Sequence, residues 1–201
     1  MTTGGLLIIL SAPSGTGKST LVKLLLQKRS DLELSISHTT RPPRSSERDG
    51  VEYHFVTAET FENMVVSGQF AEYANVYRHR YGTSNAEIAR ITGEHRHVVF
   101  DIDVQGAKQL MSGYPDAVSI FVLPPSLDVL ENRLRGRGTE TEESFRTRFA
   151  CAQSETDNYI NYRYTVVNDV LDDAVSDILS IIRAEELRSI RQKDVVGRLS
   201  G

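Results

Sequence analysis

A glycine-rich segment close to the N-terminus constrains the fold of this chain more than any other feature. The apolar residues 6–10 lead into residues 12–19, which read APSGTGKS, and a helical pattern follows over about residues 18–29. Glycines allow the backbone to turn its N–H groups toward phosphate oxygens, and the N-terminus of the following helix adds positive potential. A strand, this loop and a helix in succession predict a P-loop that binds a nucleoside triphosphate.

The polar residues of the loop have expected roles. Lys18 is expected to reach the β- and γ-phosphates, and the hydroxyl of Ser19 to bind Mg²⁺. Ala12 stands where the usual pattern, GxxxxGK[ST], has its first glycine, which is compatible with a negative φ at that residue. The alternative is a glycine- and serine-rich loop without a ligand, and the apolar run before the loop argues against it. The predicted triphosphate-binding residues of this segment are Ser11, Ala12, Pro13, Ser14, Gly15, Thr16, Gly17, Lys18, Ser19 and Thr20.

Short, fully apolar runs alternate with helical patterns along much of the chain. Candidate strands lie at residues 98–100, 118–123 and 164–167, with a candidate fifth strand at 34–36, and the last helical pattern covers about residues 171–191. Strands that are apolar on both faces are typical of a parallel sheet covered by helices. We therefore predict an α/β protein with a five-stranded parallel sheet and helices on both faces.

One stretch departs from this alternation. Residues 38–95 are more polar and rich in Arg and Tyr, which predicts a lobe inserted into a core made of about residues 1–37 and 96–201. Within it, the sequence from Ser84 to Glu87 predicts a capping box at the start of a helix. Gly136 and Gly138 indicate a short lid over about residues 136–147. All three parts belong to one expected domain, residues 1–201.

Composition excludes several classes of function. The 201 residues carry a formal net charge of −4, which argues against a general nucleic-acid binder. The apolar run at residues 6–10 is too short to span a membrane and leads directly into the glycine loop, so we expect a cytoplasmic protein without a membrane partner. The single cysteine, Cys151, excludes an internal disulfide and is expected to be a small buried thiol. The sequence leaves open whether the protein is a monomer or a homo-oligomer.

A second anion site is indicated by the segment SHTTRPPR at residues 37–44. Arg41 and Arg44, stiffened by the two prolines between them, are placed to grip one phosphate, and Tyr53 and Tyr81 can add hydroxyl donors. A kinase whose acceptor already carries a phosphate needs two anion sites, because phosphoryl transfer depends on positioning and on positive charge.

Together these patterns resemble the guanylate kinase family. The matching segments, in the family's order, are the P-loop, the arginine-rich segment, Gly50-x-x-Tyr53, Glu72, Tyr81-Gly82-Thr83, Asp101-Ile102-Asp103-x-Gln105-Gly106, Arg137-Gly138-Thr139-Glu140 and Val167-Asn168-Asp169. They cover about residues 6–170. The resemblance implies a P-loop kinase fold and transfer of the terminal phosphoryl group from ATP to GMP, with Mg²⁺ as cofactor and a role in purine nucleotide supply.

The resemblance also implies a division of roles on the GMP side. Arg41, Arg44, Tyr53 and Tyr81 would hold the GMP phosphate, and Ser37, Glu72 and Thr83 would read the guanine. A carboxylate suits guanine, which presents N1–H and N2–H₂ donors, whereas adenine would oppose it with a lone pair at a cost of roughly 2–5 kcal/mol. Asp103 is expected to face the acceptor nucleoside. Asp101 is expected to lie near GMP and to pair with Lys18. It is also expected to contact the Mg²⁺ bound by Ser19 through a water molecule.

On the ATP side, the resemblance implies three arginines at the transferring phosphoryl group. The expected catalytic residues are Lys18, Arg41, Arg133, Arg137 and Arg148, and Asn168 and Asp169 are expected near the adenine. Arg146 is interpreted instead as an ion-pair partner of Glu142, one helical turn earlier.

Two alternatives remain at this point. A non-catalytic binding module with a guanylate-kinase-like fold would not bind ATP, and a P-loop kinase of another phosphorylated acceptor would lack the guanine-reading residues. An acceptor screen separates them. We also expect dGMP to be accepted, because no residue clearly requires the ribose 2′-hydroxyl.

Overall fold

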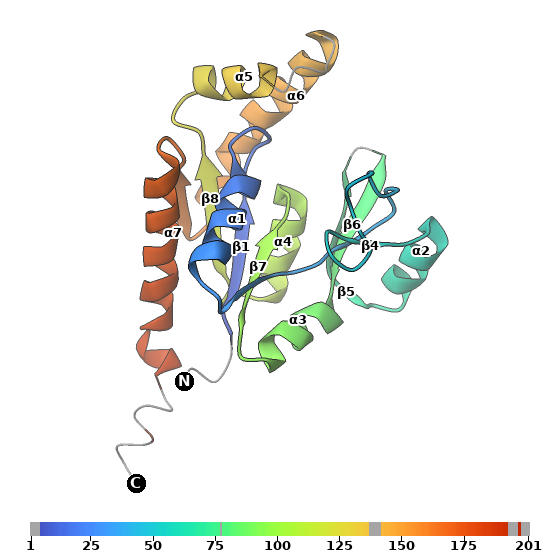
Figure 1. Cartoon of the computed structure of the whole chain (residues 1–201), viewed down its shortest axis with the longest axis vertical. Helices are drawn as coiled ribbons and strands as arrows, with labels where there is room; N and C mark the ends of the chain where they lie inside the picture. Colours follow the sequence, from blue (N-terminus) through green and yellow to red (C-terminus); the bar gives the residue numbers. More distant parts are fainter. Residues whose placement is uncertain (1–4, 77, 137–141, 193–196, 198–201) are drawn as a thin grey trace.

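A computed structural model describes residues 5–76, 78–136, 142–192 and 197. Its centre is a five-stranded sheet in the order β2-β7-β1-β8-β9, and every neighbouring pair is parallel. This sheet confirms the predicted fold class (Figure 1). The strands are β1 (Leu7–Ser11), β2 (Leu32–Leu34), β7 (His97–Asp101), β8 (Val118–Leu123) and β9 (Tyr164–Val167).

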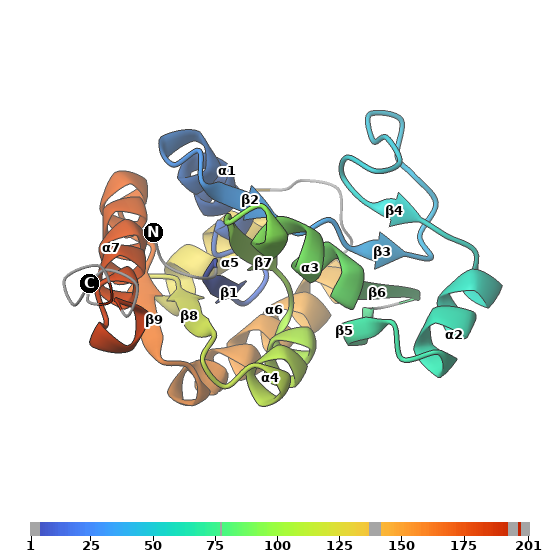
Figure 2. The ribbon, with the colours of Figure 1, turned by 90° about the horizontal axis from the view of Figure 1, so that it is seen from below.

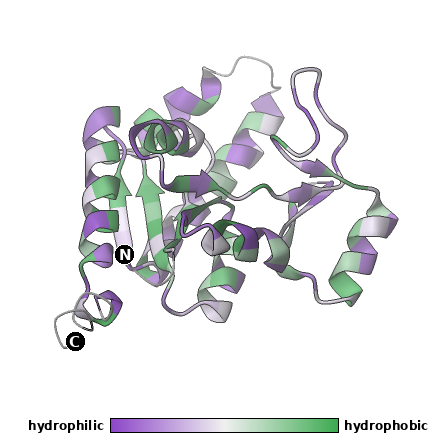
Figure 3. Ribbon diagram, turned by 60° about the horizontal axis from the view of Figure 1, so that its bottom comes forward, coloured by the Kyte–Doolittle hydropathy of each residue, from purple (hydrophilic) through white to green (hydrophobic). Residues whose placement is uncertain are grey.

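Helices cover both faces of this sheet, as the apolar strands predicted. Figure 2 shows α1 (Lys18–Lys28) and α7 (Leu171–Glu186) on one side and α4 (Val104–Gly113) on the other, with α3 (Asn85–Gly93) beside it. Along β1 the side chains alternate, so that Ile8 and Leu10 pack toward α1 and α7 while Ile9 packs toward α3 and α4. Each of these fully buried aliphatic side chains contributes about 1.5–3 kcal/mol through burial. Figure 3 shows the central strands in the colour of hydrophobic residues.

Two expected boundaries were wrong. The strand expected at residues 34–36 is β2 (Leu32–Leu34); the Ser35 amide still donates to the Val99 carbonyl of β7 at 2.9 Å, and the chain leaves the sheet after it. The last helix ends at Glu186 and not near Arg191, and a short 3₁₀ turn, η2 (Ser189–Arg191), follows. Arg188 has φ −56° and ψ 132°, which is not helical and ends the regular hydrogen bonding.

The inserted lobe contains a second sheet of four short strands, in the order β4-β3-β6-β5. They are β3 (His38–Thr39), β4 (His54–Phe55), β5 (Phe70–Val76) and β6 (His79–Ser84), and α2 (Ala58–Val66) lies beside them (Figure 1). Phe61 is the fully buried centre of this lobe; its ring centroid lies 4.6 Å from that of Phe70, and the guanidinium of Arg80 lies 4.7 Å above it. The lobe thus has a small aromatic core of its own.

The chain crosses between the core and the lobe at two neighbouring places. Ser84 caps α3, and its hydroxyl accepts a hydrogen bond from the Glu87 amide at 3.2 Å, as expected. The other half of the predicted capping box does not form, because the buried Glu87 carboxylate binds the Ile36 amide at 3.1 Å and the Arg90 guanidinium. Glu87 therefore joins the returning chain at α3 to the outgoing chain after β2.

Two further helices lie beyond the carboxyl end of the central sheet (Figure 1). They are α5 (Leu127–Arg135) and α6 (Glu142–Thr156), which pack through Leu130, Leu134 and Phe145 and are followed by the 3₁₀ turn η1 (Asp157–Asn161). Of the lid expected at 136–147, residues 137–141 lie outside the described part of the chain. Among the helices described, none has the length and apolar character needed to cross a membrane.

Candidate functional site

The P-loop joins β1 to α1 at the carboxyl end of the sheet. Gly15 and Gly17 have φ of 93° and 91°, a left-handed conformation that side chains disfavour. Gly17 is also the N-cap of α1 and provides no side chain to cap it, so the first amides of α1 remain free to bind an anion. Nearby packing also requires both glycines: a Cβ on Gly15 would lie 2.9 Å from Leu134, and one on Gly17 would lie 2.7 Å from Nδ2 of Asn168.

Lys18 and Ser19 at the start of α1 both reach the carboxyl end of β7. Nζ of Lys18 lies 3.0 Å from Oδ1 of Asp101 and donates a hydrogen bond to the Ile102 carbonyl. The Ser19 hydroxyl donates to Oδ2 of the same carboxylate at 3.3 Å. Asp101 follows the apolar part of β7, whose parallel pairing with β1 sets Leu10 opposite it. The pairing of β1 with β7 therefore fixes the position of the lysine and the hydroxyl.

A cavity of about 490 Å³, here called the P-loop cavity, opens above these residues. Every predicted residue from Ala12 to Thr20 lines it, whereas Ser11 is fully buried at the end of β1. Its other walls come from the end of β5, from the start of α4 and from α6, and comprise Asn75, Val76, Asp103, Gln105, Thr147, Arg148, Cys151 and Glu155.

The prediction that Cys151 is buried was wrong. Its thiol is exposed and faces the P-loop cavity, 3.8 Å from Oε1 of Glu155. Arg148, Cys151 and Glu155 recur at helical spacing on one side of α6. A small apolar residue in a helix suits a cavity wall as well as a core, so composition alone did not distinguish the two.

Glu155 was missed by the sequence analysis, although its spacing from Arg148 on α6 was a usable signal. Its pKa is raised, first by burial and then by the nearby negative charge of Asp103, while Lys18 opposes the rise. The wall of the P-loop cavity thus carries a half-buried carboxyl group that also accepts a hydrogen bond from the backbone of Ser14 in the loop.

The predicted residues outside the loop hold several different positions. Arg148 lines the cavity, and its Nη2 donates to the Ser14 hydroxyl at 3.1 Å. Arg133 points instead at backbone, with Nη1 and Nη2 each 3.1 Å from the Asn168 carbonyl and Nη1 3.4 Å from that of Thr16. Arg133 therefore holds the back of the loop.

Asn168 has the same role from the end of β9. Its side chain is buried and donates to the Thr16 carbonyl at 2.7 Å. Asp169, the next residue, is exposed in the turn before α7. Arg137 lies outside the residues that the structure describes. Arg146 pairs with Glu142 at 3.4 Å across one helical turn, which confirms the interpretation made from its spacing.

A second cavity of about 220 Å³, the lobe cavity, lies between the core and the inserted lobe. Lys18, Val76 and Asp103 line both cavities, so the two adjoin at the P-loop lysine. The structure brings six residues predicted for GMP into the lobe cavity, namely Ser37, Tyr53, Glu72, Tyr81, Asp101 and Asp103.

Glu72 on β5 is the most unusual side chain of the lobe cavity. It is only 4% exposed, and burial, with a smaller contribution from Asp103, raises its pKa to about 7. Thr83 lies opposite it in the β5–β6 pairing and lowers the pKa by hydrogen bonding. The Thr83 hydroxyl is in turn 3.4 Å from that of Ser37. A buried carboxyl beside two hydroxyls can accept donors from a planar base while the hydroxyls bind an adjacent polar atom.

The two arginines of the segment 37–44 are organised by Glu47, which the sequence analysis did not identify. Nη2 of Arg41 lies 2.8 Å from Oε1 of Glu47, and the Arg44 amide donates to Oε2 at 2.8 Å. This pairing raises the pKa of Arg41, and its guanidinium lies 5.4 Å above the ring of Tyr53. The Arg44 residue is exposed at the surface. The sequence signal for Glu47 was its position three residues after Arg44 in the same loop.

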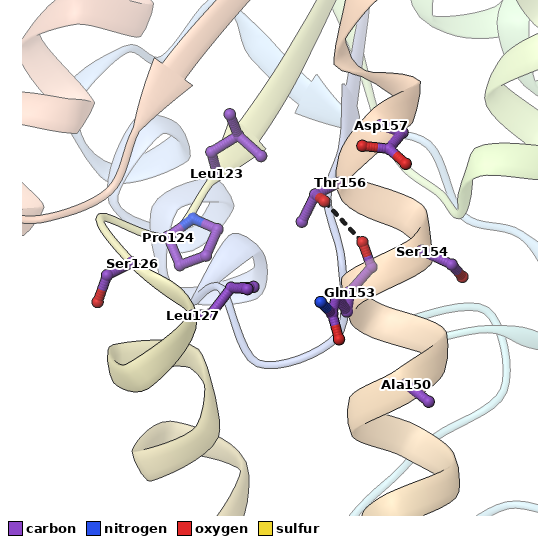
Figure 4. A pocket seen from close by; sticks show the side chains of 9 residues that line it. All are labelled: Leu123, Pro124, Ser126, Leu127, Ala150, Gln153, Ser154, Thr156 and Asp157. Atoms are coloured by element: carbon purple, nitrogen blue, oxygen red, sulfur yellow. Dashed lines mark hydrogen bonds between the residues drawn. The ribbon is translucent and has the colours of Figure 1, made fainter.

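A further cavity, of about 640 Å³, lies elsewhere (Figure 4). It is bounded by the segment from Leu123 to Leu127 and by residues of α6 other than those that face the P-loop, and its only charged lining residue is Asp157. Neither phosphate-binding arginines nor the loop glycines line it. It therefore lacks the cationic groups that a nucleotide phosphate requires.

A cluster of Asp31, His97 and Glu186 has the composition of a metal site. However, Nδ1 of His97 accepts a hydrogen bond from the Leu6 amide at 2.8 Å, so its proton is on Nε2, which faces Glu186 at 3.1 Å. Arg29 pairs with both carboxylates. The cluster is thus an ion-pair network that joins α7 to the sheet.

The sequence of this chain is similar to those of known proteins. Residues 5–185 match the sequence model of the guanylate kinase family. The chain is 44% identical over 194 residues to a guanylate kinase of Sphingopyxis alaskensis, covering 96% of this chain and 88% of that protein. It is 45% identical over 195 residues to a guanylate kinase of Neisseria gonorrhoeae, covering 97% and 95%.

A solved structure shows the same similarity in three dimensions. The crystal structure of guanylate kinase from Anaplasma phagocytophilum is similar to this chain with a TM-score of 0.77 at 29% sequence identity. The similarity covers 95% of this chain and 91% of that one. It therefore extends over nearly the whole of both chains.

Proposed function

The chain belongs to the guanylate kinase family, and we propose that its P-loop cavity holds ATP, that its lobe cavity holds GMP, and that Lys18 stands between them. The activity is that of the family, transfer of the terminal phosphoryl group of ATP to GMP to give ADP and GDP. One observation carries the assignment of the cavities: Lys18 and Asp103 line both of them, so two nucleotides can meet there. Full-length relatives named guanylate kinase favour the enzyme over a binding module and over a kinase of another acceptor.

The ATP side of the proposal depends on backbone amides. With Gly15 and Gly17 in the left-handed region, the loop presents N–H groups and the N-terminus of α1 to the triphosphate. Lys18 neutralises the phosphates, and its contacts with Asp101 and the Ile102 carbonyl keep the side chain extended before ATP binds. Arg133 and Asn168 support the loop from behind by holding the Thr16 carbonyl.

Guanylate kinases use ATP with Mg²⁺, and the oxygen atoms at this site fit that ion. The Ser19 hydroxyl and the Asp101 carboxylate lie 3.3 Å apart beside the phosphate loop, and Mg²⁺ prefers oxygen ligands with several waters retained. Ser19 would bind the ion directly and Asp101 through water. When bound, Mg²⁺ neutralises negative charge on the phosphates of ATP.

On the GMP side, phosphate and base are read by different groups. Arg41, with Tyr53 and Tyr81 beside it, would hold the GMP phosphate, and Arg44 would join from the surface of the same loop. Glu72 would accept the N1–H and N2–H₂ donors of guanine, and Ser37 and Thr83 would serve its O6. Neither the phosphate-binding residues nor the guanine-binding residues require a ribose 2′-hydroxyl, so dGMP is also an expected acceptor.

Transfer itself requires charge and positioning and no strong base. The attacking GMP phosphate oxygen is already anionic at neutral pH, and Arg148 together with Lys18 neutralises the phosphoryl group as it moves. Arg137 is also proposed to neutralise the phosphoryl group. Arg133 is proposed to contribute indirectly, because it holds the P-loop in place. Closure of the inserted lobe over the nucleotides would exclude water that otherwise accepts the phosphoryl group.

The test is an acceptor screen with the purified protein. ADP formation is followed with ATP, Mg²⁺ and each of GMP, dGMP, AMP, CMP and UMP. The proposal expects turnover with GMP and dGMP, and background rates with the other three. Equal turnover with AMP would refute the assignment of Glu72, and ATP binding without turnover of any acceptor would refute the pairing of the two cavities.

A further inference from the structure

Gly106, in the first turn of α4, touches the carboxylate of Glu72 across the junction of core and lobe. A Cβ built on Gly106 would lie 2.4 Å from Oε2 of Glu72 and 3.1 Å from its Cδ. Separations under 3.0 Å are closer than real Cβ contacts, so one of the two groups would have to move. The carboxylate of Glu72 therefore occupies the space that any other residue at position 106 would need.

The backbones on both sides of this contact are held in place. Glu72 is 4% exposed and paired with Thr83 in the β5–β6 ladder, and the β5 backbone is joined to α4 by Gln109, whose amide bonds both N–H and C=O of Tyr73. The Gly106 amide is held by the capping carboxylate of Asp103 at 2.9 Å. Because both backbones are fixed, a side chain at 106 would displace the Glu72 carboxylate and not the helix.

We propose that Gly106 is a positioning residue for guanine specificity, because the absence of a side chain there lets Glu72 keep its carboxylate over the first turn of α4. This inference rests on the proposed reading of guanine by Glu72. Glycine is a poorer helix former than alanine, so at this position helix stability is given up for space.

The experiment compares Gly106→Ala with Gly113→Ala, the same change in the same helix, where a Cβ would meet nothing within 4 Å. The readout is the preference for GMP over IMP, measured as the ratio of their kcat/KM values, because hypoxanthine lacks the 2-amino group that Glu72 would read. We expect Gly106→Ala to lower this preference about tenfold or more, the loss typical of a charged hydrogen bond. The KM of Gly106→Ala for ATP should change less than about twofold. In Gly113→Ala, which is remote from the site, both the GMP preference and the KM for ATP should change less than about twofold.

A double-mutant cycle tests whether Gly106 acts through Glu72. In a Glu72→Ala background the carboxylate is gone, so adding Gly106→Ala should change the GMP preference by less than about twofold. An equal loss in both backgrounds would overturn the inference, as would a wild-type preference in Gly106→Ala alone. If Glu72→Ala keeps the wild-type preference for GMP over IMP, the proposed role of Glu72 is wrong. If Glu72→Ala loses that preference and Gly106→Ala keeps it, the role of Glu72 stands and the inference about Gly106 is wrong.

Folding is followed by thermal unfolding of all four variants. If Gly106→Ala alone is unfolded, the double variant with Glu72→Ala should fold, because the group that the new Cβ meets has been removed. A double variant that also fails to fold would show that Gly106 is required by α4 itself, and would overturn the inference.

Discussion

Replacing Glu72 by Gln should stabilise the unliganded protein while impairing GMP binding. Glu72 is buried, and its surroundings raise its pKa to about 7, so that the folded state disfavours its charge. Glutamine has nearly the same shape and can keep a hydrogen bond to Thr83, but it carries no charge. The variant therefore removes the cost of an ionised buried carboxyl and little else.

The magnitude follows from linkage between ionisation and folding. Below about pH 4.5 the carboxyl is protonated in both the folded and the unfolded protein, so Glu72→Gln has little effect. Between pH 4.5 and 7 the unfolded chain ionises first, and the cost to the folded state grows. Above pH 7 it is constant, and moving the pKa from 4.5 to about 7 corresponds to about 3 kcal/mol.

Urea unfolding at pH 5, 7 and 9 measures this difference. With an m value of about 2–3 kcal/mol/M, the midpoint of Glu72→Gln should exceed that of the wild type by about 1 M or more at pH 9, and by much less at pH 5. Glu59→Gln, an exposed carboxylate of the same lobe, is the matched control and should change the free energy of unfolding by less than about 1 kcal/mol. A difference between Glu72→Gln and wild type that is the same at all three pH values would refute the reasoning.

Three further predictions concern the two nucleotide cavities. Arg148→Ala should lower kcat by about 100-fold or more in steady-state assays, whereas Arg146→Ala, an exposed neighbour paired with Glu142, should change it less than about twofold; equal effects would contradict the assignment. Lys18→Met should lower kcat by about 100-fold or more while GMP still protects the lobe from proteolysis, and near-normal turnover would count against it. Arg41→Ala should raise the KM for GMP about 10–100-fold with the KM for ATP unchanged, and exposed Arg48→Ala in the same loop should not.

The sheet could be predicted because its strands are apolar on both faces. Residues 118–123 and 164–167 form β8 and β9 with the expected bounds. The strand near residue 34 was misplaced because Leu34-Ser35-Ile36 alternates like a strand. The path of the chain after β2 depends on the bond between the Ile36 amide and Glu87, which lies 51 residues later. Local pattern identifies a strand whose burial is complete, but not the point where the chain leaves the sheet.

Site residues divide in the same way. The P-loop has a sequence signature because its chemistry is local. The structure places it in one cavity with Arg148 and pairs its Lys18 with Asp101, which lines the adjoining lobe cavity. Glu47 and Glu155 carry no such signature. Their spacing from Arg44 in one loop and from Arg148 on α6 was the only signal, and spacing alone does not show what a carboxylate contacts. The space that Gly106 leaves for Glu72 is a property of two packed backbones, which no spacing in the sequence reports.

The two crossings between core and lobe have a consequence for how such enzymes diverge. The Ile36 amide and the Glu87 carboxylate lie 3.1 Å apart, and His38 sits opposite Gly82, so the lobe begins and ends at almost the same place. A segment with adjacent ends can be exchanged without rerouting the remaining chain. The residues proposed to bind ATP lie almost wholly outside that segment, so exchange of one contiguous stretch of the chain would alter most of the proposed acceptor site while the P-loop is retained.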